Sequence, residues 1–427
     1  MKTTSWIGVT VLLAQLAACT VPKEEAGEIR LLDRHNRSAV GPYFAYDTAG
    51  VPVLCWTEKG AADSTYRLAF SSYDPVSGSF GQPRVVTGSE GISTSAESMG
   101  KIAFKDDGTI VAVFAKPFAN EKNPFAGAIY YSISKDQGTS WSPARFLHTD
   151  TAHHYGRQFF DLATLGNGEV GAVWLDGRDS TIEGSTLFFA ATIPDGGFGS
   201  ETVVHRGTCE CCRTDLLVDD AGHLHVAYRS LMYPAALVGD QVRDMAYVHS
   251  EDHGQSFSAE QPISADHWAI RACPHTGPSL AVTANRLHAV WFTAGGGTGL
   301  YYANSSPDTR RFGRRILLSA TGTHPQLIAV DRDAVAVAYE ERMQPEAVEA
   351  GHGDAHGHGN HSTPKAVDSR IQLQLIADGQ PATAETITTG GANHHPVMAR
   401  MDDRVLVAWV CEDGNRSGIA YTAKRWR

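Results

Sequence analysis

The sequence predicts an all-β chain folded as a seven-bladed β-propeller of four-stranded antiparallel blades, with a six-bladed ring as the alternative. Three observations predict it: very apolar strands that end in an aromatic residue recur, turn residues separate them, and the aromatic residues stand 48 to 70 residues apart. Repeats of this length and pattern are typical of propeller blades. The seven closing aromatic residues are Trp56, Phe114, Trp174, Tyr228, Trp291, Tyr339 and Trp409.

The N-terminal segment has the pattern of a lipoprotein signal peptide. Lys2 precedes an apolar stretch from Trp6 to Leu16, which runs into Leu-Ala-Ala-Cys ending at Cys19. This pattern predicts a signal peptide over residues 1–18, lipidation at Cys19 and a short tether over residues 19–26. Thr20 in place of aspartate favours an outer-membrane lipoprotein that faces the periplasm or the cell surface. An ordinary signal peptide with a coincidental cysteine is the alternative.

Residues 27–427 then form one propeller domain, anchored to the membrane only through the lipid. After Trp409 the chain supplies only one more strand, from Ile419 to Thr422, so the last blade lacks its outer strand. We expect Glu28 to Leu32, with the sequence EIRLL, to pair there and close the ring, because an open propeller would leave unpaired sheet edges. The net charge of −11 and the lack of a basic stripe argue against a nucleic-acid partner.

Two segments between the third and fourth strands of their blades share a turn pattern. They are Ser134 to Trp141, SKDQGTSW, and Ser250 to Phe257, SEDHGQSF. In such a turn the aspartate binds backbone amides, the glycine adopts positive φ and the aromatic residue packs on the blade edge. Both segments resemble the Asp-box of the sialidases, or BNR repeat, and the resemblance covers nearly the whole mature chain. It implies the scaffold more than an activity, because Asp-boxes are structural.

Five consecutive blades place His or Cys where the chain enters the innermost strand. In a four-stranded blade these entrances emerge on the same face as the loops between the second and third strands, so the residues are expected to line one funnel. Imidazole and thiolate groups suit zinc or copper. The candidate metal ligands are His154, Cys209, Cys211, Cys212, Cys273, His275, His324 and His395.

Two features leave open which residues would bind the metal ion. The sixth blade carries an insertion, residues 344–368, whose four histidines could capture the same ion or form a polar loop with incidental affinity. Apart from Cys19 the chain has six cysteines, an even number in an oxidising compartment, which also favours disulfides at the funnel rim. Bridged cysteines beside ion-binding histidines are a third possibility.

The sialidase resemblance implies a different site, that of an exo-acting glycoside hydrolase. Arginines would bind the substrate carboxylate, and a tyrosine nucleophile, a glutamate and an aspartic acid would carry out the reaction. The implied binding residues are Arg157, Arg178, Arg213, Arg229, Arg243 and Arg271, and the implied catalytic residues are Tyr155, Asp179, Asp244, Glu340 and Glu341. An Arg/Asp network between blades is the alternative. The Arg-Ile-Pro segment that opens sialidase sequences is absent here.

The leading hypothesis is a membrane-anchored propeller that binds copper or zinc in its funnel. The alternatives are a sialidase-type exo-glycosidase and a non-catalytic propeller that binds a partner, such as a metal-handling or envelope protein, through a disulfide-braced rim.

Overall fold

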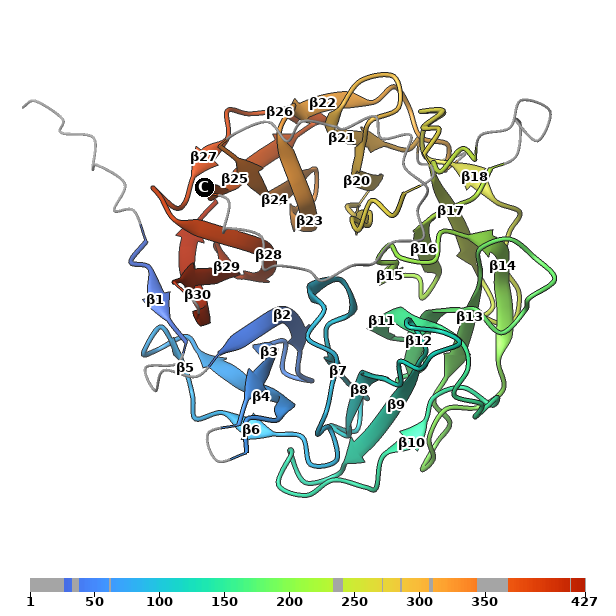
Figure 1. The fold of residues 1–427 in the computed structure, drawn as a ribbon. Helices are drawn as coiled ribbons and strands as arrows, with labels where there is room; N and C mark the ends of the chain where they lie inside the picture. The colour runs from blue at the N-terminus through green and yellow to red at the C-terminus, as the bar shows by residue number, and fades with distance from the viewer. Residues whose placement is uncertain are drawn as a thin grey trace, which may run out of the picture.

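The chain forms a closed ring of seven antiparallel sheets around a central axis, which confirms the seven-bladed prediction (Figure 1). The computed structural model describes residues 27–32, 38–60, 63–232, 241–270, 272–284, 286–306, 310–343, 368–414 and 416–426. Cys19, Arg271 and the histidine-rich insertion therefore lie outside the described residues, apart from Asp368. Blades I to VII follow in chain order.

Each blade runs from its innermost strand outward. Blades I to III contain β2 Ala39–Tyr46, β3 Pro52–Lys59, β4 Tyr66–Asp74, β5 Ser79–Phe80 and β6 Arg84–Val85; β7 Lys101–Phe104, β8 Ile110–Pro117, β9 Gly127–Ser134 and β10 Arg145–Phe146; β11 Arg157–Thr164, β12 Val170–Asp176, β13 Ser185–Ala191 and β14 Thr202–Thr208. A short 3₁₀ turn, η1 Ala96–Ser98, precedes β7.

Blades IV to VII continue the pattern. They contain β15 Asp215–Val218, β16 Leu224–Arg229, β17 Met245–Ser250 and β18 Gln261–Pro262; β19 Ser279–Val282, β20 Leu287–Thr293, β21 Gly299–Asn304 and β22 Ile316–Ser319; β23 Gly322–Asp331, β24 Ala334–Arg342, β25 Ser369–Ala377, β26 Gln380–Pro381 and β27 Glu385–Thr386; β28 Ala392–Met401, β29 Arg404–Asp413, β30 Arg416–Arg425 and β1 Arg30–Leu31.

The second strand of every blade is almost fully buried, because neighbouring blades cover both of its faces. All seven predicted aromatic residues lie on these strands, and none is more than 2% exposed. Three of the four buried indole N–H groups on these strands find acceptors: Trp56 donates to Glu58, Trp291 to Asp266 and Trp409 to Asn393, whereas that of Trp174 has no partner. The repeated apolar strand was therefore a correct guide to the core.

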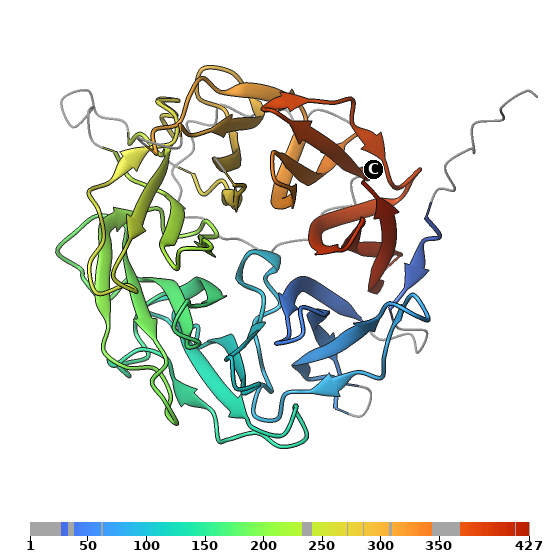
Figure 2. The same ribbon diagram turned by 180° about the vertical axis from the view of Figure 1, so that it is seen from behind.

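The N-terminal strand closes the ring as predicted. β1 pairs antiparallel with β30, Arg30 opposite Tyr421 and Leu31 opposite Ala420, and Leu32 extends the pairing by donating its amide to the carbonyl of Ile419. Figures 1 and 2 both show β1 beside β30 at the outer edge of the last blade. The fourth strand of blade VII thus comes from the start of the propeller.

The two predicted turns lie between the third and fourth strands of blades II and IV. In the first, Asp136 accepts hydrogen bonds from the amide and hydroxyl of Ser140, and Gly138 has φ +84°. Trp141 then packs edge-on against Phe70 of blade I, with ring centroids 6.1 Å apart. The second turn repeats this arrangement, so each turn also joins its blade to the preceding one.

Polar side chains of the innermost strands link one blade to the next around the axis of the ring. Asp161 accepts the amide of Leu216, and Asp215 accepts the amide of Leu280. Ser279 and Gln326 make the equivalent bonds to blades VI and VII. These bonds fix the positions of the innermost strands relative to one another along the ring axis. The candidate site lies at the entrances of these strands.

Candidate functional site

A bulge at the entrance of the innermost strand recurs in blades I, VI and VII. Strand register shifts at Val40/Tyr43, Thr323/Gln326 and His394/Val397. The residue at the bend has positive φ in all three: Gly41 +59°, His324 +48° and His395 +51°. Glycine adopts this conformation readily, whereas a non-glycine residue held there costs about 1–3 kcal/mol. Blade III has a similar bulge at Gln158/Phe160, where Phe159 has φ +53°, so the strained bend occurs with and without a histidine.

Cys209, Cys211 and Cys212 form a buried thiol cluster in the loop between β14 and β15. Their exposed fractions are 1%, 7% and 1%. The Sγ atom of Cys209 lies 3.6 Å from that of Cys211 and 3.7 Å from that of Cys212. All three atoms lie within 4.8 Å of one another, so the sequence-predicted cysteines of this motif do converge.

The surroundings of the thiol cluster favour a negative charge on one of its sulfurs. Close contacts with the thiols of Cys211 and Cys212, helped by the guanidinium of Arg243, lower the pKa of Cys209 although burial opposes this. Arg243 Nη1 lies 3.3 Å from the Cys209 sulfur. Burial raises the pKa of Cys212 to about 12, and hydrogen bonding to its neighbours raises that of Cys211. The neighbouring guanidinium of Arg243 thus favours negative charge at Cys209.

The other cysteines are placed differently. Cys273, from the loop before β19, is exposed but its thiol interacts with that of Cys211. Cys55 and Cys411 lie apart, each bonded to backbone carbonyls of its own surroundings. All six described cysteines are free thiols.

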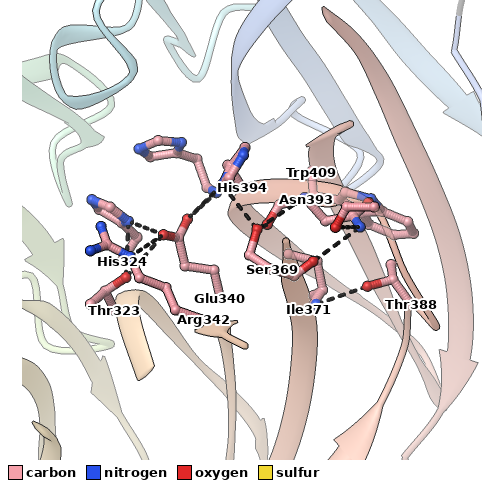
Figure 3. A network of polar contacts seen from close by, with 12 residues as sticks. Thr323, His324, Glu340, Arg342, Ser369, Ile371, Thr388, Asn393, His394 and Trp409 are labelled. Atoms are coloured by element: carbon pink, nitrogen blue, oxygen red, sulfur yellow. Dashed lines mark hydrogen bonds and ion pairs between the residues drawn. The ribbon is translucent and has the colours of Figure 1, made fainter. Parts of the chain in front are cut away.

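A second group of polar residues gathers around Glu340 at the tops of β23, β24 and β28, as Figure 3 shows. Glu340 is 2% exposed and accepts hydrogen bonds from Thr323 Oγ1 at 3.0 Å and from the amide of His395 at 3.1 Å. His324 Nδ1 lies 3.0 Å away and His394 Nδ1 3.7 Å away. Burial opposes its charge, but His324 and His394 outweigh this and lower the pKa of Glu340 well below its usual value.

Glu97, on η1, completes this group from the far side of the ring and was missed by sequence reasoning. It is 6% exposed, and neither carboxylate oxygen has a hydrogen-bond partner. Its Oε1 lies 3.9 Å from Nε2 of His324. One ligand atom each of Glu97, His324 and His395 lie within 4.8 Å of one another. Nothing in the local sequence marks Glu97, since its position depends on how the loop before β7 reaches over the axis.

The rings of the other two predicted histidine ligands, His275 and His154, lie outside this group. His275 is exposed and contributes its backbone carbonyl, which lies 3.2 Å from His324 Nε2. His154 is exposed and its carbonyl accepts a bond from Asn123. Of the four predicted histidine ligands, the structure therefore brings together the rings of His324 and His395, with centroids 4.3 Å apart.

The described arginines implied by the sialidase resemblance lie in three separate networks. Arg157 is fully buried and shares Asp176 with Arg178, which also binds Glu201. Arg229, 1% exposed, donates to the backbone carbonyls of Arg243, Thr276 and Phe292. Arg213 donates to the carbonyl of Pro325 beside Glu97. Arg271 lies outside the described residues.

The implied acid and nucleophile candidates also have structural partners. Asp179 pairs with Arg206, and Asp244 accepts the amides of His267 and Trp268. Glu341 binds Ser319 and Gln372. The ring of Tyr155 lies 5.2 Å from the guanidinium carbon of Arg157.

Two surface cavities lie away from these clusters. One, of about 970 Å³, lies beside β1 and β5, and the other, of about 500 Å³, lies between the outer parts of blades I and II. Over the part of the chain described, no helix has the length and apolarity needed to cross a bilayer.

Fold and site together define a β-propeller with a buried thiol cluster and a separate Glu/His group at its entrances. No family model matches the chain, and no curated protein matches it by sequence.

Several solved structures are similar in fold. A protein of unknown function from Dyadobacter fermentans matches 95% of this chain and 100% of its own, with 13% identity and a TM-score of 0.54. A polysaccharide lyase of family PL25, an ulvan lyase, matches 91% of this chain and 94% of its own, with 13% identity and a TM-score of 0.54. A Trypanosoma rangeli sialidase matches 91% of this chain and 55% of its own, with 12% identity and a TM-score of 0.48. At these identities the likeness extends to the propeller fold alone.

Proposed function

We propose that this protein is a metal-binding propeller that holds one copper or zinc ion at the thiol cluster of Cys209, Cys211 and Cys212, with Cys273 as the fourth ligand. The carrying observation is the sulfur spacing of 3.6 and 3.7 Å. Four thiolates at about 2.3 Å from a tetrahedral ion stand about 3.8 Å apart, whereas disulfide sulfurs stand about 2.05 Å apart. The spacing fits the edges of a thiolate tetrahedron.

The surroundings of the cluster support this proposal. The three sulfurs are almost fully buried against Leu231 and Phe159, which would keep water and oxidants from a bound ion. Arg243 offsets part of the negative charge that several thiolates would bring. Cys273 already interacts with Cys211, so rotation of an exposed side chain would complete the coordination. Soft thiolate ligands select copper(I) and zinc over calcium or magnesium.

Cys209→Ser is expected to reduce binding at the cluster from about one ion per chain to none, because Cys209 contacts both other buried thiols and would supply one of the four ligands. Zinc or copper(I) titration against a chromophoric chelator, under reducing conditions, measures the change. Cys411→Ser is the matched control, since its sulfur lies outside the cluster and a hydroxyl can replace its contact with Gly418. Equal binding by Cys209→Ser and the unmodified protein would contradict the proposal.

A thiol count separates ligands from disulfides. When the purified protein is denatured with a chelator and without reductant, we expect all four cluster cysteines to react with a thiol reagent. Two bridges would leave none of them reactive and would instead support a disulfide-braced funnel.

We also propose that a lipid on Cys19 anchors the propeller to the outer membrane, where it would exchange its ion with another metal-handling envelope protein. The lipobox supports this location. Cys19→Ala is expected to abolish incorporation of labelled fatty acid and to release the protein from the membrane fraction. Unchanged labelling of the variant would refute lipidation at Cys19.

A further inference from the structure

We propose that Glu97, His324 and His395 form a second metal site, distinct from the thiol cluster, that binds a divalent first-row transition ion. It draws on blades II, VI and VII, whereas the thiol cluster draws on the loops that lead into blades IV and V. Two imidazoles and one carboxylate on different blades define three corners of a coordination sphere and leave positions open toward the funnel.

The carboxylate of Glu97 is the first support. It is 6% exposed and neither oxygen has a hydrogen-bond donor, although buried charged groups are almost always both paired and hydrogen-bonded. Its ion-pair neighbour His324 comes only to 3.9 Å, between Nε2 and Oε1, and the charge of Arg213 acts on it without a hydrogen bond. A cation between Glu97 and the two rings would bond directly to these oxygens.

The position of Glu340 is the second support. Metal-binding histidines usually donate their other ring N–H to a carboxylate, which fixes the tautomer and the ring orientation. His324 does this through Nδ1, 3.0 Å from Glu340, so that Nε2 faces Glu97. Glu340 also accepts the amide of His395 and thereby fixes the bend that presents the second ring. It is a positioning residue for both histidines.

The ligand atoms are close enough to bind one ion after small adjustments. They lie within 4.8 Å of one another, and an ion with bonds of about 2.1 Å would draw them to about 3–3.5 Å. His324 Nε2 would exchange its contact with the carbonyl of His275, 3.2 Å away, for the ion. Mixed nitrogen and oxygen ligands suit zinc, cobalt(II), nickel(II) or iron(II), in contrast to the softer thiol cluster.

Cobalt(II) titration of the full mature chain tests the proposal, because it reports each site separately. Thiolate ligation gives strong sulfur-to-cobalt charge transfer in the near ultraviolet, whereas nitrogen and oxygen ligation gives weak visible bands only. The background variant carries His352→Asn, His356→Asn, His358→Asn and His361→Asn, so that the insertion cannot supply imidazoles. Adding Cys209→Ser and Cys211→Ser removes the thiol cluster.

In the variant that lacks both the insertion histidines and the thiol cluster, one equivalent of cobalt(II) is expected to bind. It should give the weak visible bands without the near-ultraviolet charge-transfer band. Glu97→Gln or His395→Asn is expected to abolish it, and Glu340→Gln to weaken it by about 10- to 100-fold. His253→Asn is the matched control, since His253 is exposed on the opposite face and also has positive φ, +58°, which asparagine tolerates. Circular dichroism of each variant checks the fold.

Absence of the visible bands, or their persistence in both Glu97→Gln and His395→Asn, would overturn the second site. Neither result affects the thiol cluster, whose charge-transfer band is read in the variant that keeps its cysteines.

Discussion

Lys101→Met is expected to destabilise the propeller by about 3–5 kcal/mol, because it would leave the buried carboxylate of Asp161 uncompensated between blades II and III. Lys101 is 2% exposed, and its Nζ lies 2.7 Å from both Asp161 Oδ1 and the carbonyl of Phe160. Asp161 in turn accepts the amide of Leu216 in blade IV. One lysine thus helps to join three blades. Urea unfolding of the metal-free protein measures the loss.

A double-mutant cycle shows whether this loss comes from the charge. Asp161→Asn keeps an oxygen for Leu216 but removes the charge that Lys101 neutralises, so the double variant is expected to be more stable than Lys101→Met alone. Strictly additive single effects, or a loss below about 1 kcal/mol in Lys101→Met, would show that the pair contributes little.

The propeller fold could be predicted from the sequence because propeller blades repeat a local pattern. Trp174 and Trp291 end apolar strands bounded by turn residues, and burial on both faces of a central strand demands that composition. The closing role of β1 followed from counting strands in blade VII, since an unpaired edge had to be covered. These are local or topological arguments, and they need no knowledge of side-chain directions.

Only part of the candidate site could be predicted from the sequence. The spacing of Cys209, Cys211 and Cys212 keeps them together in any short loop, so their convergence could be predicted. His154 and His324 occupy comparable blade entrances, yet only His324 has its ring in the Glu340 group. Entrance position gives the face of the ring but not the direction of a side chain. Glu97 could not be predicted, because its loop reaches the axis only through packing against blades I and III.

The implied arginines illustrate the same limit. Their positions on the funnel face resembled those of a carboxylate-binding set, but each of the five that the structure describes has partners that the sequence does not reveal. Arg157 is fully buried with Asp176, and Arg229 holds three backbone carbonyls together. In both cases the guanidinium joins loops to one another. An arginine count therefore says little about an anion site until the acceptors are known.

Asp215 is expected to make the stability of the propeller depend on pH between about 4 and 7. Burial, and then the charge of Asp161, raise the pKa of Asp215 from 3.8 to about 7. In this range the folded chain keeps a proton that the unfolded chain loses, so the free energy of unfolding falls as pH rises. This contribution to stability is present in full below about pH 4 and is lost above about pH 7.

Asp215→Asn is expected to remove this component while keeping an oxygen for the amide of Leu280. Urea unfolding at pH 5 and pH 8 should show a smaller loss of stability on raising the pH in the variant than in the unmodified protein. Ser279→Ala is the matched control, since Ser279 makes the equivalent bond to Leu327 without a charge, and its removal should lower stability equally at both pH values. Parallel losses in the Asp215→Asn variant and the unmodified protein would show that Asp215 does not hold its proton. A raised pKa at Asp215 means that burial and the charge of Asp161, which Lys101 pairs, together disfavour a second carboxylate charge near the axis.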